Sequence, residues 1–175
     1  MASSGDISKF LAFADDAAIK TCLDIGCGTG QLTRELSHRG YRCVGIDASA
    51  SAVKRAQSLT AVPAEHLSYL RFDIEHDDMK LLPRAQYSLI TCKLVYAFIE
   101  DREIFFSRVA QLLAPDGLFV VVTPLPEDVT PEKRGIAAAP EAMQQLAEAF
   151  EQVALYKSGT LTYFVGQHRV PSLRG

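Results

Sequence analysis

The sequence of 175 residues has the length of one ordinary domain, and we expect a single domain over residues 1–175. Hydrophobic residues make up 48% and charged residues 22%, which excludes a disordered chain and a fibrous one. No apolar run approaches the roughly 18 residues that a membrane span requires. We therefore expect no membrane partner, and the net charge of −3, which does not favour binding to a polyanion, leads us to expect no nucleic-acid partner.

The cysteines indicate a reducing compartment. Cys22, Cys27, Cys43 and Cys92 show no C-x-x-C spacing and have no histidine at ligand spacing, so we expect no metal site. Three of them lie in or beside apolar runs typical of buried strands, where a reduced thiol behaves as a small hydrophobe. Residues 1–6 carry no secretory signal, and we expect a cytoplasmic protein.

The first half of the chain alternates strands with helices. Apolar spacing predicts one short leading helix within residues 1–20, which would form a small N-terminal cap. Compact apolar runs then predict three strands, over 21–25, 41–46 and 67–72. A helix closed by Gly40 follows the first strand, and a helix capped by Ser49 follows the second.

The second half continues this alternation and then changes it. Strands are expected over 87–92 and 118–123, with a helix over 104–113 and a turn at Pro115-Asp116-Gly117 between them. A helix over 140–149 precedes two runs, 153–157 and 161–167, that flank a glycine turn and predict a hairpin. The pattern therefore indicates an α/β, doubly wound and mostly parallel sheet whose last strand is antiparallel.

Residues 124–140 form the longest stretch without clear periodicity, and they contain four prolines. They follow the carboxyl end of the last parallel strand, the edge at which open parallel sheets bind ligands. This stretch is either a lid over a site or a plain surface loop.

The strongest functional signal is Leu23-Asp-Ile-Gly-Cys-Gly-Thr-Gly30, in which glycines lead from a strand directly into a helix. Glycines at such a turn let a ligand approach the backbone and the helix N-terminus. A dinucleotide fingerprint reads G-x-G-x-x-G and holds an anionic pyrophosphate, which Asp24 would repel. A ligand with an ammonium and a sulfonium group would be attracted to Asp24.

This segment resembles the first motif of class I S-adenosylmethionine-dependent methyltransferases of the small-molecule type, and later segments resemble the family's other motifs in order. Gly45-Ile-Asp47 is similar to the second motif, whose acid binds both ribose hydroxyls. Arg71-Phe-Asp73-Ile74 is similar to the third, in which an acid binds the adenine amino group and the next backbone N–H meets the ring. The resemblance covers residues 20–168 and implies seven strands in the order 3-2-1-4-5-7-6. It implies cofactor contacts at Asp24, Gly26, Cys27, Gly28, Gly30, Asp47, Ala48, Asp73, Ile74 and Cys92.

Two of these acids have an alternative role. Asp24 either contacts the ligand or only holds the glycine loop. Asp73 lies among Glu75, His76, Asp77 and Asp78, so it is either an adenine ligand or one of several solvated acids.

The acceptor side carries fewer signals. No Asn/Asp-Pro-Pro-aromatic run follows the fourth strand, which argues against methylation of exocyclic or amide nitrogens, and no Pro-Cys pair suggests cytosine chemistry. Many small-molecule relatives place histidines where this chain has Tyr96, Ala97 and Phe98, so an obvious general base is missing. An acceptor that is already anionic or neutral is therefore favoured, or catalysis by positioning alone.

Lys93 and Tyr96 are the candidate catalytic residues. With Leu94 and residues 124–140 they would form the acceptor cavity, and Lys93 would hold an anionic substrate; the alternative is that Lys93 faces solvent.

The sequence thus predicts methyl transfer from S-adenosylmethionine to a small molecule by in-line displacement, leaving S-adenosylhomocysteine. Two alternatives stay open. One is a regulatory or scaffolding domain that binds the cofactor without turnover. The other is a nicotinamide-dependent oxidoreductase, disfavoured by Asp24, by the glycine spacing and by the lack of a Tyr-x-x-x-Lys pair.

Overall fold

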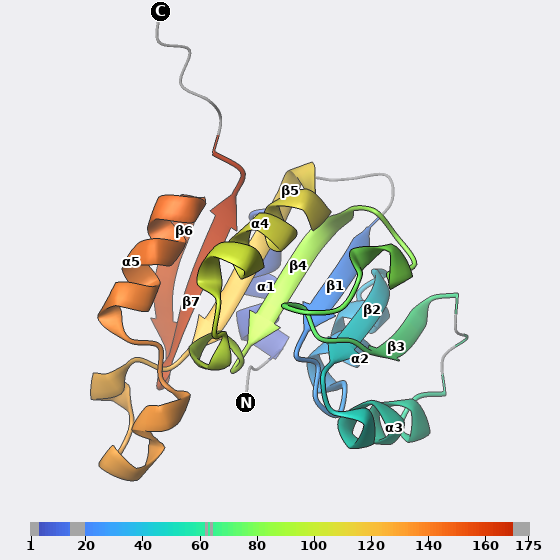
Figure 1. Cartoon of the computed structure of the whole chain (residues 1–175), viewed down its shortest axis with the longest axis horizontal. Coiled ribbons are helices and arrows are strands. Elements are labelled where there is room, and N and C mark those ends of the chain that lie inside the picture. Colours follow the sequence, from blue (N-terminus) through green and yellow to red (C-terminus); the bar gives the residue numbers. More distant parts are fainter. Residues whose placement is uncertain (1–3, 15–19, 62, 64, 170–175) are drawn as a thin grey trace, which may run out of the picture.

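A seven-stranded sheet runs through the protein (Figure 1), in a computed structural model that describes residues 4–14, 20–61, 63 and 65–169. Its strand order is β3-β2-β1-β4-β5-β7-β6, which confirms the predicted topology. The strands are β1 (Thr21–Ile25), β2 (Arg42–Asp47), β3 (Leu67–Arg71), β4 (Tyr87–Lys93), β5 (Leu113–Thr123), β6 (Glu151–Ser158) and β7 (Leu161–Gln167). Strands β1 to β5 pair in parallel, whereas β7 runs antiparallel to both β5 and β6.

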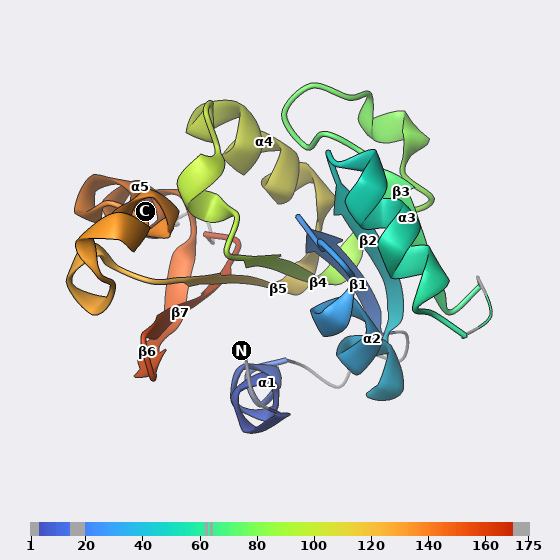
Figure 2. The ribbon, with the colours of Figure 1, turned by 90° about the horizontal axis from the view of Figure 1, so that it is seen from below.

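Helices cover both faces of the sheet (Figure 2), as apolar parallel strands require. One apolar cluster packs α1 (Ser4–Leu11), α2 (Gln31–His38) and α3 (Ala50–Ser58) against one face. The other cluster packs α4 (Arg102–Leu112) and α5 (Pro140–Ala149) against the opposite face. The carboxyl ends of the parallel strands meet at one edge of the sheet, beside the loop that follows β1.

Two segments differ from the sequence-based expectation. The expected turn at residues 115–117 lies inside β5, which begins at Leu113 and pairs there with Tyr87 before the register shifts to the pair Leu89–Leu118. These residues form an irregularity within β5 and not a turn between two elements, because the residues on both sides of them pair with β4. Residues 124–140 are not featureless, since they contain two short 3-10 helices, η3 (Pro126–Asp128) and η4 (Pro131–Ile136).

No helix in the described part of the chain is both long enough and apolar enough to cross a membrane.

A buried carboxylate links three elements at the centre of the sheet. Asp24 of β1 is only 2% exposed. It accepts hydrogen bonds from the Thr33 hydroxyl of α2 at 2.6 Å and from the Thr91 hydroxyl of β4 at 2.8 Å. Burial raises the pKa of Asp24 from 3.8 to about 6, and the two threonine hydrogen bonds oppose that rise. Asp24 therefore joins β1, α2 and β4 below the glycine loop.

This buried acid predicts a specific pH dependence of stability. Between pH 4 and pH 6 folded Asp24 holds a proton that unfolded Asp24 has already lost. Raising the pH through this window therefore lowers the free energy of unfolding, by on the order of 3 kcal/mol from this group. The Asp24→Asn variant lacks this contribution. Urea unfolding of both proteins at pH 4, 5, 6 and 7 should show the wild type losing stability relative to the variant as the pH rises.

The comparison with Asp24→Asn cancels the titration of every other group, because those groups are common to both proteins. Parallel pH profiles would show that Asp24 has an ordinary pKa in the folded state. The stability of both proteins is measured without ligand, so that any ligand contact of Asp24 does not enter.

Candidate functional site: the glycine loop and the carboxyl edge of the sheet

The glycine loop leaves β1 and enters α2 in a left-handed backbone conformation. Gly26, Gly28 and Gly30 have φ values of 66°, 53° and 77°. The loop is fixed to β2 by two backbone donors: the Cys27 N–H donates to the Ile46 carbonyl at 2.9 Å, and the Gly28 N–H donates to Asp47 Oδ2 at 2.9 Å. The first and second sequence motifs are thus joined by direct hydrogen bonds.

Gly26 also permits a close approach by the turn that follows β4. A Cβ atom placed on Gly26 would overlap the side chain of Val95. Leu94, just before Val95, has a φ of 60°, which is uncommon for a residue other than glycine, and its N–H donates to the Val122 carbonyl at 2.8 Å. The chain therefore turns sharply at the end of β4 and brings Val95 against the glycine loop.

The carboxylate of Asp47, the last residue of β2, lies beside this loop. Oδ2 accepts the Gly28 N–H, and Oδ1 accepts the Ser49 N–H at 2.8 Å. A carboxylate has about four lone-pair positions, so each oxygen can still accept a further hydrogen bond. The side chain is half-buried, and its orientation is fixed by backbone groups before any ligand binds.

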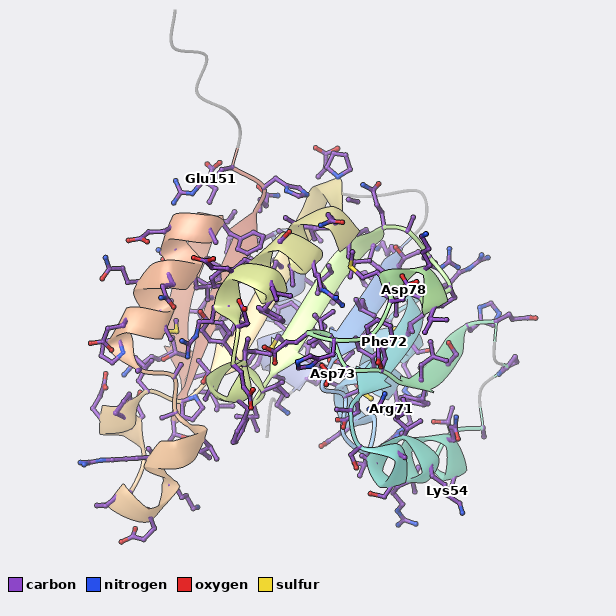
Figure 3. The ribbon with its side chains drawn as sticks, viewed as in Figure 1. Lys54, Arg71, Phe72, Asp73, Asp78 and Glu151 are labelled. Atoms are coloured by element: carbon purple, nitrogen blue, oxygen red, sulfur yellow. The ribbon has the colours of Figure 1, made fainter. Side chains whose placement is uncertain are left out.

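Asp73 lies two residues beyond β3 (Figure 3) and is engaged by its own loop. Oδ1 accepts the Glu75 N–H at 2.9 Å, and Oδ2 lies 3.0 Å from Nδ1 of His76. Partial burial opposes ionisation, but these hydrogen bonds and the His76 ring outweigh it, and the pKa of Asp73 lies below its ordinary value. Asp73 is therefore ionised at neutral pH, with part of its acceptor capacity used within the loop.

The loop after β3 is fastened to α4 by two side chains that the sequence analysis did not identify as site residues. Oε1 of Glu75 accepts the backbone N–H groups of Glu100 and Asp101, at 3.1 and 2.7 Å. The guanidinium of Arg108 donates to the carbonyls of Ile74 and Asp77, at 3.1 and 2.6 Å. These contacts hold the β3 loop facing the turn after β4.

Between these loops lies a cavity of about 240 Å³. Its polar lining comes from Asp47, Asp73 and Glu75. The rest of the lining is mostly apolar and consists of Ile25, Gly26, Ile46, Ala48, Phe72, Ile74, Val95, Phe98 and Ile99. We call this space the β2–β3 cavity. It combines carboxylate acceptors with apolar surface, which suits a ligand with hydroxyl groups and an aromatic ring.

Half of the residues expected at a cofactor site line this cavity: Gly26, Asp47, Ala48, Asp73 and Ile74. The others lie behind it or beside it. Asp24 has both oxygens bound to threonines, Cys92 is fully buried in the core, and Gly30 sits under the ring of Tyr69. Cofactor contacts stay predictions for all ten residues, those that line the cavity included.

Val95, Phe98 and Ile99 line the cavity but were not expected there. The strand order provides the signal that could have found them. Because β4 pairs directly with β1, the segment after β4 must adjoin the glycine loop.

The two candidate catalytic residues occupy different environments. Tyr96 is fully buried, packs near Phe105 at a ring distance of 6.2 Å, and donates from its hydroxyl to the Ala142 carbonyl of α5 at 2.5 Å. Tyr96 thus packs in the core of the protein, and its catalytic role stays a prediction. Lys93 is half-buried and lines a second cavity, between α1 and α2. The described residues include no cluster of three or more His, Cys, Asp or Glu side chains able to hold a metal ion.

The contact between Gly26 and Val95 can be tested with a matched pair of glycines. Gly26→Ala and Gly28→Ala both place a side chain at positive φ, which costs about 1–2 kcal/mol. Only Gly26→Ala adds an overlap, since nothing lies within 4 Å of a Cβ on Gly28. We expect Gly26→Ala to lose a further 1–3 kcal/mol of unfolding free energy, roughly the cost of overpacking. Urea unfolding without ligand measures the free energy of unfolding of the two variants and of the wild type.

A double-mutant cycle supplies the control for this comparison. Val95→Ala removes the overlapping methyl groups, so Gly26→Ala should cost less in that background, with a coupling above about 0.5 kcal/mol. Equal losses for the two glycine variants, or an absence of coupling to Val95, would contradict the close approach.

Comparisons with known proteins agree with this geometry. Residues 23–121 match the family model described as a methyltransferase domain, which is more than half of the chain. A ubiquinone biosynthesis O-methyltransferase of Bradyrhizobium diazoefficiens is 33% identical over 101 residues, which make up 58% of this chain and 38% of that protein. A protein of the same name from Rickettsia canadensis is 26% identical over 117 residues, 67% of this chain and 48% of that protein. The chain thus spans less than half the length of these relatives.

Solved structures show the same fold at low identity. An S-adenosylmethionine-dependent methyltransferase from Mesorhizobium loti superposes with a TM-score of 0.73 at 17% identity, over 95% of this chain and 99% of that one. A glycopeptide N-methyltransferase, MtfA, complexed with S-adenosylmethionine gives a TM-score of 0.72 at 12% identity, over 93% and 92% of the two chains. Since the family model matches across the glycine loop, β2, β3 and β4, the chain belongs to the class I S-adenosylmethionine-dependent methyltransferases.

Proposed function

We propose that this protein transfers a methyl group from S-adenosylmethionine to a small-molecule acceptor. The observation that supports it most directly is the β2–β3 cavity, in which Asp47 is held by the glycine loop and faces apolar surface from the turn after β4. Family membership supports the same reaction.

The residues of the β2–β3 cavity fit the nucleoside part of this cofactor. Asp47 keeps free acceptor positions on both oxygens, which suits the two hydroxyls of a ribose. Phe72, Ile74 and Phe98 offer apolar surface to a base, and Asp73 offers an ionised acceptor to its amino group. The methionine part would then extend along Gly26 toward the end of β4.

The chain's own contribution to the chemistry is binding and alignment. When bound, S-adenosylmethionine supplies a methyl carbon activated by a positively charged sulfur. Asp47 and the glycine loop would fix the cofactor, and the end of β4 would present the acceptor in line with that carbon. Alignment of this kind can contribute on the order of 7–11 kcal/mol. This account needs no general base on the chain, in keeping with the burial of Tyr96.

The relatives support a small-molecule acceptor without fixing the atom that is methylated. Their names include ubiquinone biosynthesis O-methyltransferases and a glycopeptide N-methyltransferase. The single-domain organisation, the cytoplasmic location and the absence of a nucleic-acid partner stay parts of this proposal, and residues 124–140 stay either a lid or a surface loop.

Two measurements test the proposed function. Calorimetry should show binding of S-adenosylhomocysteine and no comparable binding of NAD. A turnover assay should detect S-adenosylhomocysteine formed from S-adenosylmethionine when a panel of phenols, amines, thiols and carboxylates is supplied. Binding without turnover on any acceptor would favour the regulatory domain, and binding of NAD alone would favour the oxidoreductase.

The two acids of the β2–β3 cavity should contribute unequally to cofactor affinity. Asp47→Ala removes a carboxylate that can accept two hydroxyl hydrogen bonds, each charge-assisted and worth about 1.5–3 kcal/mol. Asp73→Ala removes one contact, to the amino group of a base whose ring the Ile74 N–H can also contact. We expect an affinity loss for S-adenosylhomocysteine of at least about a hundredfold for Asp47→Ala and about tenfold for Asp73→Ala, by calorimetry.

Asp116→Ala is the matched control, since Asp116 is an exposed acid in β5 outside the cavity lining. Its affinity should equal that of the wild type. Equal and small losses for Asp47→Ala and Asp73→Ala would mean that the ribose acid has been misplaced.

A further inference from the structure

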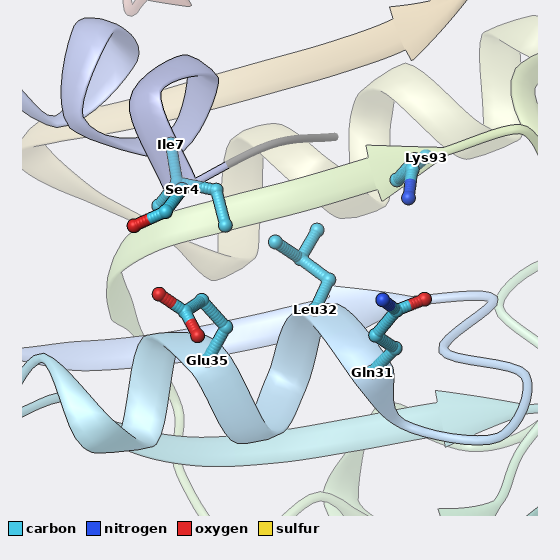
Figure 4. A pocket seen from close by; sticks show the side chains of 6 residues that line it. All are labelled: Ser4, Ile7, Gln31, Leu32, Glu35 and Lys93. Atoms are coloured by element: carbon cyan, nitrogen blue, oxygen red, sulfur yellow. The ribbon is translucent and has the colours of Figure 1, made fainter. Parts of the chain in front are cut away.

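A second cavity, of about 200 Å³, lies between α1, α2 and the end of β4 (Figure 4). We call it the α1–α2 pocket. Its lining is Ser4, Ile7, Gln31, Leu32, Glu35 and Lys93, and it shares no residue with the β2–β3 cavity. Gln31 directly follows Gly30 of the glycine loop, and Lys93 directly precedes the turn that contacts Gly26. The pocket therefore adjoins the end of the glycine loop opposite to Asp47.

The α1–α2 pocket has two polar ends and an apolar middle. Figure 4 shows Lys93 and Gln31 at one end, Ser4, Ile7 and Glu35 at the other, and Leu32 between them. Ile7 and Leu32 are only 3% and 7% exposed, so they form a packed apolar wall.

The charge of Lys93 is not matched by a bonded partner. Within the described part of the chain, neither Lys93 nor Gln31 has a hydrogen-bonded side chain, and no carboxylate lies within ion-pair distance of the ammonium. Lys93 lowers the pKa of Asp24 electrostatically, but both Asp24 oxygens accept threonine hydroxyls. A half-buried ammonium beside a free amide can therefore receive an anion from outside.

The opposite end of the pocket is already neutralised and fixed in place. Glu35 pairs with Arg39 at 3.1 Å. The same guanidinium donates to the hydroxyl of Ser8 at 2.8 Å, and to the carbonyl and hydroxyl of Ser4 at 2.8 and 2.7 Å. Arg39 thus fastens α1 to α2 beside the pocket. Among the described residues that line the pocket, Lys93 carries the charge that no bonded partner neutralises.

We propose that the α1–α2 pocket binds the methyl acceptor, and that the acceptor is a compact carboxylate with an apolar body. Its carboxylate pairs with Lys93 and accepts from the amide of Gln31, and its apolar body lies against Ile7 and Leu32. The volume equals that of roughly seven water molecules at ~30 Å³ each, which suits one ring or a short chain. This assignment rests on the proposed function, and it replaces an acceptor cavity built with Tyr96.

The carboxylate that pairs with Lys93 could also belong to the cofactor, because the methionine part of S-adenosylmethionine carries one. The two sources differ in a measurable way. If Lys93 binds the cofactor, its replacement weakens the binding of S-adenosylhomocysteine but not that of methylthioadenosine, which has no carboxylate. If Lys93 binds the acceptor, its replacement leaves the affinities for S-adenosylhomocysteine and methylthioadenosine unchanged.

The test uses benzoate as the probe and benzamide as its neutral isostere, on protein saturated with S-adenosylhomocysteine. Calorimetry should show benzoate binding at least tenfold more tightly than benzamide. Lys93→Met should reduce benzoate affinity at least tenfold and leave benzamide unchanged, whereas Lys93→Arg should retain most of the preference. Gln31→Trp, at an exposed position, should weaken both probes by filling the pocket.

Lys54→Met is the matched control, because Lys54 is an exposed lysine on α3 (Figure 3) outside the pocket lining. Its affinities should equal those of the wild type. Benzoate binding that is no tighter than benzamide binding, or that survives Lys93→Met, overturns the proposal. So does a loss of S-adenosylhomocysteine affinity in Lys93→Met with methylthioadenosine affinity unchanged.

Failure of the proposed function gives a different result. Either S-adenosylhomocysteine binds the wild type without turnover on any acceptor, or it does not bind at all, and in the second case the benzoate titration is repeated on the free protein. A preference for benzoate that depends on Lys93 then supports an anion pocket without methyl transfer, and its absence overturns both.

Discussion

The buried carboxylate of Asp24 is the constraint around which the carboxyl edge of the sheet is arranged. An acid that is 2% exposed costs free energy unless its oxygens are hydrogen-bonded, and here the hydroxyls come from two different elements. Thr33 can reach Asp24 only if α2 starts where the glycine loop places it. Thr91 can reach it only if β4 pairs in register beside β1, as the Asp24–Thr91 pairing shows. Satisfying one buried group therefore fixes a loop, a helix and a strand together.

A second close contact extends this arrangement to the turn after β4. Gly26 has no side chain, and Val95 occupies the space that a Cβ would need. The positive φ of Leu94 turns the chain so that Val95 can reach that position. A strained residue persists only where surrounding contacts determine it, and here the Leu94 N–H is held by Val122 of β5. The same turn separates the two cavities, since Val95 lines the first and Lys93 the second.

The two cavities carry opposite charge. The β2–β3 cavity presents Asp47, Asp73 and Glu75, whereas the α1–α2 pocket presents Lys93 and a carboxylate already paired with Arg39. Such a division suits a cofactor that brings hydroxyl and amino donors to one side and an acceptor that brings an anion to the other. Under the proposed function, the glycine loop is the place where the two ligands meet.

The sequence by itself determined the alternation of strands and helices, the glycine loop and the acids at the ends of β2 and β3, because each depends on local patterns of apolar, glycine and acidic residues. The exact sheet order followed from the resemblance to a known family. Hydrophobic periodicity separates strands from helices, and positive φ selects glycine. Burial and distant partners were decided by the tertiary structure. The residues around Tyr96 do not indicate that its hydroxyl will donate to Ala142 of α5, which is 46 residues away in the sequence. The sequence around Glu75 and Arg108 does not show that they fasten the β3 loop to α4. Lys93 lines a pocket only because α1 packs beside α2. Contacts between elements distant in sequence are set by packing, which local patterns do not encode.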